Sequence, residues 1–479
     1  MAKTTDLNLK LIHSGFWFTI STSITTILTT IQTFILGKFL TEYQFGLYSL
    51  VFLFQTLFEA FSQIGVRDAL IQSKVNNEDM LHTAFWMEVI RGILMYTIII
   101  PLSFILSSVY HENYLKILLL VFSTKFVFNG LKNIKLIQLY KDFNTKRLVF
   151  IQQIPMIITS IAMMISAYQY SNILLIVCIQ VIGEVFSLIF SYLAYPFNIK
   201  LSFHLKYAKE LLSFGKHIFI LSILAFFLRQ IDYLFISKFI SIEALGLYTL
   251  AYKITNLPVT NLVYVISNIT FPLYSKFQDR NEIIYKYFNL FNRMILYVVI
   301  PFALIILFDG QYLLNLLFKD KWNGLYLLVA SLLIFSAIRT SCAMLGSVFK
   351  AKGRVDIDNK MSVIELSILV ILIYPCYHLY RLYGVVIAIT IAIFVRYIIS
   401  ILELYKMLSV TGFITNLLKP FGMFVLSMLI NMLLNIVIIK ETLFIVVGKI
   451  VIYLGLFTVL LFFVEKENII TFKNIYYEK

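Results

Sequence analysis

The chain has 479 residues, of which 60% are hydrophobic and 14% charged, with mean hydropathy +0.88 and a formal net charge of +15. Soluble domains contain about 45–50% apolar and about 25% charged residues, so this composition excludes a single water-soluble core. The apolar residues fall in runs of about 20, the length of a helix that crosses a bilayer. We therefore predict an all-α polytopic membrane protein.

The apolar runs predict fourteen membrane-spanning helices joined by mostly short links. No link is long enough to hold a soluble catalytic domain. In chain order, the predicted spans are 13–37, 43–66, 83–107, 114–139, 148–168, 172–196, 213–238, 244–271, 290–309, 324–349, 360–379, 382–404, 417–439 and 442–464.

A segment near the N-terminus recurs 200 residues later. "GKFLTEYQFGLYSL" at 37–50 and "SKFISIEALGLYTL" at 237–250 are identical at six of fourteen positions, among them Gly46 and Gly246. Basic motifs also close the fourth span of each half, as "LYKDF" and "VFKAK". Parallel repeats are one architecture of secondary transporters, with the substrate route between the halves. The alternative is convergent use of glycine and aromatic residues at membrane interfaces.

The repeat predicts three parts of the chain. Residues 1–205 and 206–405 would form two six-helix lobes in the same orientation, and residues 406–479 would add two helices and a cytoplasmic tail.

Lysine and arginine residues predict the orientation, because they accumulate in cytoplasmic links. The links that face inward when the N-terminus is cytoplasmic are rich in them, as at Lys141, Lys146 and Arg147. The outward links hold Lys38, Lys238, Lys319, Lys321, Arg381 and Lys440. Both termini are therefore expected inside. Basic links beside anionic lipid head groups also explain the net charge without nucleic acid.

Two stretches carry a resemblance to a known family. The pattern "GKFLTEYQFGLYSLVFLFQTLFEAFSQIGVRDALIQ" at 37–72 and the stretch at 316–354 resemble the polysaccharide-transport (Wzx-type) branch of the multidrug/oligosaccharidyl-lipid/polysaccharide exporter superfamily. The resemblance implies a bacterial inner-membrane flippase that moves undecaprenyl-diphosphate-linked oligosaccharides outward for O-antigen, capsule or exopolysaccharide assembly. It also implies two six-helix lobes related by pseudo-two-fold symmetry around a V-shaped central cavity.

Basic residues inside the predicted spans are the candidate substrate ligands. A charge at the bilayer centre costs about 2.5–3.5 kcal/mol on insertion scales, so such residues usually face a polar interior. Arginine suits a diphosphate because its planar fork bonds two oxygens at once. The candidates for a cationic cavity are Arg91, Lys125, Arg229, Lys253 and Arg339, with Arg67 at the end of the second span.

Acidic residues are candidates for charge pairing or ion coupling. Glu88 lies three residues before Arg91, and Asp232 three residues after Arg229, which puts each pair on one helix face. These pairs are either internal salt bridges or switches in which substrate phosphate displaces the carboxylate. Glu59, Glu184 and Glu365 are either further candidates for carrying protons or carboxylic acids held neutral in a helix interface. Lys132, Lys135 and Arg293 are expected to anchor the chain at the cytoplasmic interface.

Enzymatic and nucleotide-driven functions have no motif in the chain. There is no G-x-x-x-x-G-K-[ST], and we expect no cofactor and no metal site. The three cysteines, Cys178, Cys342 and Cys376, are expected to be small buried hydrophobic residues. Transport would be driven by a gradient of H⁺ or Na⁺, by the membrane potential, or by consumption of the flipped product.

The sequence leaves three hypotheses for the function. The leading hypothesis is the flippase, with membrane lipids, a polysaccharide polymerase and glycosyltransferases as expected partners. The first alternative is an ion-coupled small-molecule or drug antiporter of the same superfamily, for which an acidic cavity would be expected. The second is a membrane glycosyltransferase or polymerase, against which the short links argue.

The predicted orientation can be tested by cysteine labelling in a background without the three native cysteines. We expect an impermeant thiol reagent to label His111→Cys and Lys319→Cys from outside, but not Asn144→Cys or Arg354→Cys. Reversed labelling would contradict the orientation. Protection of position 111 alone would contradict the helix count of the first half.

Overall fold

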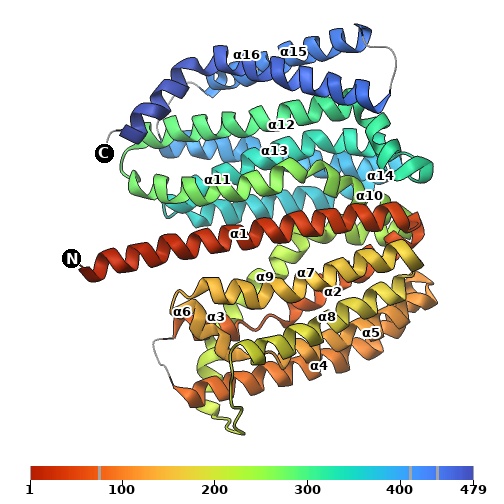
Figure 1. Cartoon of the computed structure of the whole chain (residues 1–479), viewed down its shortest axis with the longest axis vertical. Coiled ribbons are helices and arrows are strands. Elements are labelled where there is room, and N and C mark those ends of the chain that lie inside the picture. Colours follow the sequence, from red (N-terminus) through yellow and green to blue (C-terminus); the bar gives the residue numbers. More distant parts are fainter. Residues whose placement is uncertain (1, 74–76, 409–412, 438–441, 478–479) are drawn as a thin grey trace. The chain divides into compact units, whose positions relative to one another are not determined.

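The computed structural model describes residues 2–73, 77–408, 413–437 and 442–477, and every regular element within these ranges is helical (Figure 1). The chain divides into two compact units, Met1–Thr249 and Leu250–Lys479. The lobe boundary expected near residue 205 stays a prediction.

The first unit is a bundle of long helices. It contains α1 (Ala2–Phe39), α2 (Glu42–Ser62), α3 (Val66–Gln72), α4 (Glu78–Tyr110), α5 (Asn113–Gly130), η1 (Ile134–Leu136), α6 (Ile137–Lys141), α7 (Thr145–Tyr170), α8 (Ile173–Ala194), α9 (Leu205–Phe239) and the first turns of α10 (Ile242–Thr255). Helix α4 packs along α5, and α7 packs against both α1 and α8. Met80, Phe85 and Leu211 belong to a buried apolar cluster between α4 and α9.

Polar caps set where the helices of this unit begin. The Thr41 side chain accepts a hydrogen bond from the Gln44 backbone, and the Gln44 side chain accepts one from the Thr41 backbone, which forms a capping box before α2. Asn77 and Asn172 are simple N-caps of α4 and α8, whose side-chain oxygens accept hydrogen bonds from backbone N–H groups of the first turn. Such caps satisfy backbone N–H groups at the helix ends.

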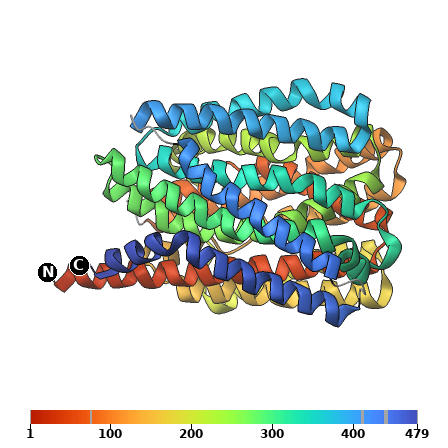
Figure 2. The same cartoon turned by 90° about the horizontal axis from the view of Figure 1, so that it is seen from above.

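The second unit continues from α10 with α11 (Leu257–Lys276), α12 (Asn281–Phe318), η2 (Lys319–Lys321), α13 (Leu325–Ala351), α14 (Val355–Leu408), α15 (Phe413–Val437) and α16 (Leu443–Tyr477). Helix α13 packs against α11, α12 and α14, while α15 and α16 pack on α12. Figure 2 shows from a second direction how these helices run alongside one another within the unit. Phe288, Met344 and Leu404 lie in a buried apolar cluster of this unit.

By length and composition, eleven helices of the described residues could cross a bilayer, or twelve if the bent pair Asn113–Gly130 and Ile134–Lys141 is one span. That pair bends by 61° where a single span, 114–139, was predicted. Helix α14 has 54 residues, about 80 Å at 1.5 Å per residue, far more than one bilayer needs. Its backbone leaves helical geometry at Arg381, which separates the two spans predicted there. The exact count of fourteen stays a prediction.

The two copies of the repeat touch at their shared glycines. A Cβ atom on Gly46 would lie 2.0 Å from the carbonyl oxygen of Ile242, and one on Gly246 would lie 2.9 Å from the backbone nitrogen of Gly46. Real Cβ atoms do not approach backbone this closely. The recurrence at an offset of 200 residues therefore marks a backbone-to-backbone contact between the starts of α2 and α10.

This contact predicts that Gly46→Ala and Gly246→Ala destabilise the protein. Overpacking costs about 1–3 kcal/mol, and here the obstacle is backbone that cannot rotate away. We expect lower abundance in the membrane and a lower melting temperature in detergent for both variants. Gly15→Ala is the matched control, because a Cβ there has no atom within 4 Å. Equal stability of all three variants would contradict the contact.

Candidate functional site

Two arginines surround one buried carboxylate at the end of α2. Glu88 of α4 is 5% exposed and accepts a hydrogen bond from Arg91 Nη2 at 2.7 Å. Arg91 Nη1 donates to the Ser62 hydroxyl at 3.0 Å, and Arg67 Nη2 of α3 lies 3.8 Å from Glu88 Oε2. We call Arg67, Glu88 and Arg91 the α4 cluster. The predicted Glu88–Arg91 pair forms, and the cluster has one positive charge in excess.

One donor of the α4 cluster is unused. Arg91 Nε is buried and has no acceptor among the described residues. Buried donors are nearly always satisfied by protein, water or ligand. The Arg67 side chain is 45% exposed, so this cluster can be approached by an anionic oxygen from the Arg67 side.

A second cluster ties three helices of the same unit together. Lys125 Nζ of α5 lies 3.3 Å from Glu184 Oε1 of α8 and 3.6 Å from Glu59 Oε1 of α2. Lys132, just beyond α5, donates to Glu184 Oε2 at 2.6 Å, and Gln55 Nε2 donates to Glu59 at 2.8 Å. We call Glu59, Lys125, Lys132 and Glu184 the α5 cluster. Its charges balance, so Lys125 is matched by carboxylates, and Lys132 is an ion-pair member as well as a residue near the interface.

Arg229 and Asp232 of α9 do not form the pair that their spacing suggested. Asp232 is buried and accepts a hydrogen bond from the Tyr248 hydroxyl at 2.5 Å. Arg229 is exposed, and the described residues provide no carboxylate within ion-pair distance of it. The three-residue spacing puts two side chains on one face, but the tyrosine of the repeat supplies a partner from a different helix.

The two remaining candidates lie in the second unit. Lys253 of α10 is exposed, and none of the ion pairs among the described residues includes it. Arg339 of α13 is half-buried, with its guanidinium carbon 5.6 Å from the Tyr252 ring centre and 5.7 Å from that of Phe335. Cation–π contacts of this kind stabilise a charge without neutralising it.

A further arginine of the second unit is shared by two carboxylates. Arg396 Nη1 donates to Glu365 at 2.6 Å, and its Nη2 donates to Asp358 at 3.0 Å. All three side chains are 16–18% exposed. We call these residues the α14 cluster, because all belong to α14, on both sides of its break at Arg381. Glu365, a candidate proton carrier, is thus held by an arginine.

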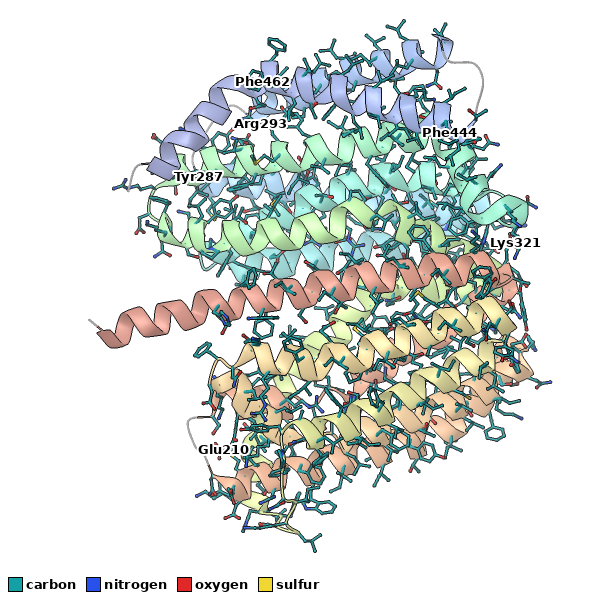
Figure 3. All side chains as sticks on the ribbon, viewed as in Figure 1. Glu210, Tyr287, Arg293, Lys321, Phe444 and Phe462 are labelled. Carbon is teal, nitrogen blue, oxygen red and sulfur yellow. The ribbon has the colours of Figure 1, made fainter. Side chains whose placement is uncertain are left out.

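Two buried ion pairs attach the C-terminal helices. Lys449 of α16 is paired with Asp309 of α12, with side chains 4% and 2% exposed, and it donates to Asn435 of α15 at 2.8 Å. A second pair joins the same two helices: Arg293 of α12 lies 3.2 Å from Glu465 of α16. Figure 3 shows Arg293 on α12. We call Asp309, Asn435 and Lys449 the α16 cluster.

Sequence reasoning missed the α16 cluster. Lys449 lies in the middle of a predicted span, which was a usable signal. Asp309 was placed at a span end because the predicted span stopped nine residues before α12 does. Arg293 has Glu465 as its ion-pair partner, and its expected position at the interface stays a prediction.

The α14 cluster predicts a strong dependence on Arg396. Removing one partner of a buried ion pair costs about 3–5 kcal/mol, because it strands the other charge. Arg396→Gln should therefore lower protein abundance in the membrane, and the triple variant with Asp358→Asn and Glu365→Gln should restore it. Abundance is measured by quantitative immunoblot of washed membranes.

Lys406→Gln is the matched control for this experiment. It removes an exposed pair, Lys406 with Glu403 at 3.4 Å, whose lysine side chain is 74% exposed. Exposed pairs contribute about 0–1 kcal/mol, so abundance should not change. An Arg396→Gln variant as abundant as Lys406→Gln would contradict the stabilising role of the α14 cluster.

Solved structures show the same fold. The lipid II flippase MurJ in an inward closed conformation matches with a TM-score of 0.77 and 14% identity, over 94% of this chain and 99% of that one. An inward-facing multidrug resistance MATE family transporter of the MOP superfamily matches with a TM-score of 0.62 and 15% identity, over 80% of this chain and 94% of that one. The chain therefore has the helical fold of this superfamily.

Relatives by sequence include two bacterial biosynthesis proteins. The chain is 25% identical to the teichuronic acid biosynthesis protein TuaB of Bacillus subtilis (strain 168) over 351 residues, 73% of each chain. It is 24% identical to the lipopolysaccharide biosynthesis protein WzxC of Escherichia coli (strain K12) over 364 residues, 75% of this chain and 74% of the other.

The sequence profile of the family described as "Polysaccharide biosynthesis protein" matches residues 35–327, more than half of the chain. This confirms the resemblance read from the repeat region. The fold is that of the solved flippase and transporter, and eleven or twelve helices of the described residues are long and apolar enough to cross a membrane. The chain belongs to the polysaccharide biosynthesis protein family, with TuaB and WzxC among its relatives.

Proposed function

We propose that the chain is a flippase that moves an undecaprenyl-diphosphate-linked oligosaccharide from the cytoplasmic to the outer leaflet of the bacterial inner membrane. The observation that carries the proposal is the family match over residues 35–327. The similar fold of a lipid II flippase supports it, because lipid II is itself a lipid-linked glycan. The product would enter O-antigen, capsule or exopolysaccharide assembly, with a polymerase and glycosyltransferases as the proteins that consume and supply it.

The head group would be bound by the basic side chains that carboxylates do not neutralise. Arg229 and Lys253 are exposed and have no ion-pair partner among the described residues, and the α4 cluster has an excess positive charge and an unused Arg91 Nε donor. A diphosphate needs such donors, since charge-assisted hydrogen bonds are about twice as strong as neutral ones. Lys125 and Arg339 would contribute to the field of the proposed cationic cavity.

The translocation step would be alternating access of the two predicted lobes, residues 1–205 and 206–405, with the polyprenyl tail remaining in lipid. The coupling ion would be H⁺ or Na⁺. Glu59 is the proposed acceptor, because its side chain is 44% exposed while it lies 3.6 Å from Lys125. Protonation of Glu59 would remove one of the two carboxylate charges that pair with Lys125. Glu88 and Asp232 would act as charge-pair residues that keep the neighbouring side chains in position.

The proposal predicts that Arg229→Gln and Lys253→Gln reduce flipping without reducing abundance. A hydrogen bond to a charged group contributes about 1.5–3 kcal/mol, which corresponds to roughly a 10- to 100-fold loss in rate. Purified protein is reconstituted in liposomes with a lipid-linked oligosaccharide, and flipping is measured as the fraction of glycan accessible to an added glycosidase.

Lys135→Gln is the matched control, because Lys135 is predicted to anchor the chain at the interface and its Nζ lies 6.0 Å from the Tyr195 ring centre. It should retain flipping. Absence of flipping by the unaltered protein would contradict the proposed function. Full flipping by Arg229→Gln and Lys253→Gln would remove both residues from the head-group site.

A further inference from the structure

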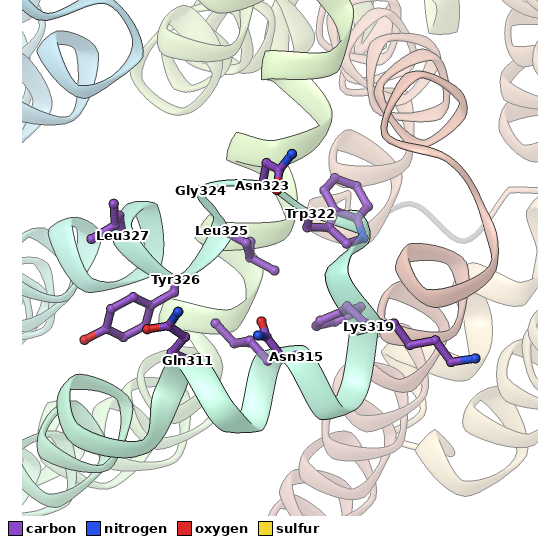
Figure 4. A pocket seen from close by; sticks show the side chains of 11 residues that line it. Gln311, Asn315, Lys319, Trp322, Asn323, Gly324, Leu325, Tyr326 and Leu327 are labelled. Atoms are coloured by element: carbon purple, nitrogen blue, oxygen red, sulfur yellow. The ribbon is translucent and has the colours of Figure 1, made fainter.

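A cavity of about 350 Å³ lies where α12 ends and α13 begins, within the second unit (Figure 4). It lies at the end of α13 opposite the basic link that follows Ala351. Under the predicted orientation this is the outer side of the membrane. The lining residues are Gln311, Leu314, Asn315, Phe318, Lys319, Trp322, Asn323, Gly324, Leu325, Tyr326 and Leu327.

The wall of the cavity is built from one face of α12 and a tight turn. Gln311 and Asn315 are four residues apart in α12, so their side chains project from the same side of the helix. In Figure 4 the two amides rise from α12 toward the turn that carries Trp322. Both residues are exposed, and neither amide has a hydrogen-bond partner among the described residues.

Left-handed backbone and a hydrogen bond from a tyrosine hold the turn in place. Gly324 has φ 80°, and Lys319 has φ 54° with ψ −170°, a conformation that non-glycine residues rarely adopt. The Tyr326 hydroxyl donates to the Leu307 carbonyl at 2.7 Å. Residues in such strained backbone persist only where their surroundings fix them, and they cluster at ligand sites. The cavity is therefore preformed.

The side chains of the cavity match the chemistry of a sugar. Amides both donate and accept hydrogen bonds, as sugar hydroxyls do. The Trp322 ring lines the cavity but is only 6% exposed, so it forms part of the wall rather than an open stacking face. Lys319 is the one charged residue among the eleven that line the cavity, which disfavours a diphosphate as the ligand.

We propose that this cavity binds one or two sugar units of the transported glycan on the outer side of the membrane. The volume lies at the low end of the range of ligand pockets, about 300–1,000 Å³, which is too small for a whole oligosaccharide. The proposal rests on the proposed function, because a glycan-bearing substrate must leave on that side. The cavity would hold the leading sugars after translocation and so disfavour their return.

Trp322 provides a direct test, because the chain has only three tryptophans, at positions 17, 86 and 322. In the variant Trp17→Phe/Trp86→Phe, all tryptophan fluorescence comes from the cavity. The purified protein in nanodiscs is titrated with chitobiose, lactose and digalacturonate, and separately with inorganic diphosphate. We expect a saturable change in intensity or emission maximum with at least one of the three disaccharides, and none with diphosphate.

Two variants and one control separate binding at the cavity from other effects. Asn315→Ala in this background should weaken the response at least tenfold, whereas Leu317→Ala, on the same helix but outside the lining, should not. The variant Trp86→Phe/Trp322→Phe, which reports from Trp17 on α1, should not respond. Size-exclusion chromatography and circular dichroism verify that each variant is folded.

Three results would contradict the proposed sugar site. No saturable response to any of the three disaccharides, a response to diphosphate alone, or a response unchanged by Asn315→Ala would overturn it. Flipping in liposomes without a Trp322 response would refute the sugar site and leave the proposed function standing. A Trp322 response in a protein that does not flip lipid-linked glycan would do the reverse.

Discussion

Pairing of charges inside apolar helices is the constraint on which the arrangement of each unit depends. A charge at the centre of a bilayer costs about 2.5–3.5 kcal/mol, so each one must meet an opposite charge or a polar space. Lys125 meets Glu184 and so joins α5 to α8, while Lys449 meets Asp309 and joins α16 to α12. Apolar helices can slide past one another in many registers, but an ion pair allows only one.

The same constraint divides the deep basic residues into two kinds. Arg396 and Lys125 are matched by carboxylates, which makes them parts of the scaffold. Arg229 and Lys253 have no such match among the described residues and are exposed. The proposed transport of an anionic head group would need both kinds of basic residue: paired ones that keep the scaffold neutral and unpaired ones that attract the head group. Unmatched exposed charge is thus the better criterion for a substrate ligand than depth in a span.

Local pattern predicted the helices well and the contacts between them poorly. Hydrophobic runs and Asn or Thr caps define where α2 and α8 lie, and the i,i+3 spacing of Glu88 and Arg91 gave a pair that forms. The same spacing between Arg229 and Asp232 gave no ion pair, because Asp232 accepts a hydrogen bond from Tyr248, sixteen residues away. Partners on other helices leave no periodic signal in a single sequence. The family resemblance came from longer stretches, 37–72 and 316–354, the first of which includes Gly46 and its close backbone contact.

The sequence separation within the α16 cluster affects how the protein is made. Asp309 and Lys449 are 140 residues apart, so at about 5–20 residues per second the ribosome adds the lysine about 7–28 s after the aspartate. During that interval α12 enters the membrane with a carboxyl group whose cation does not yet exist. Until α16 arrives, Asp309 lacks the lysine that pairs with it in the folded protein. The ion pair that joins α16 to α12 can therefore form only when synthesis is nearly complete.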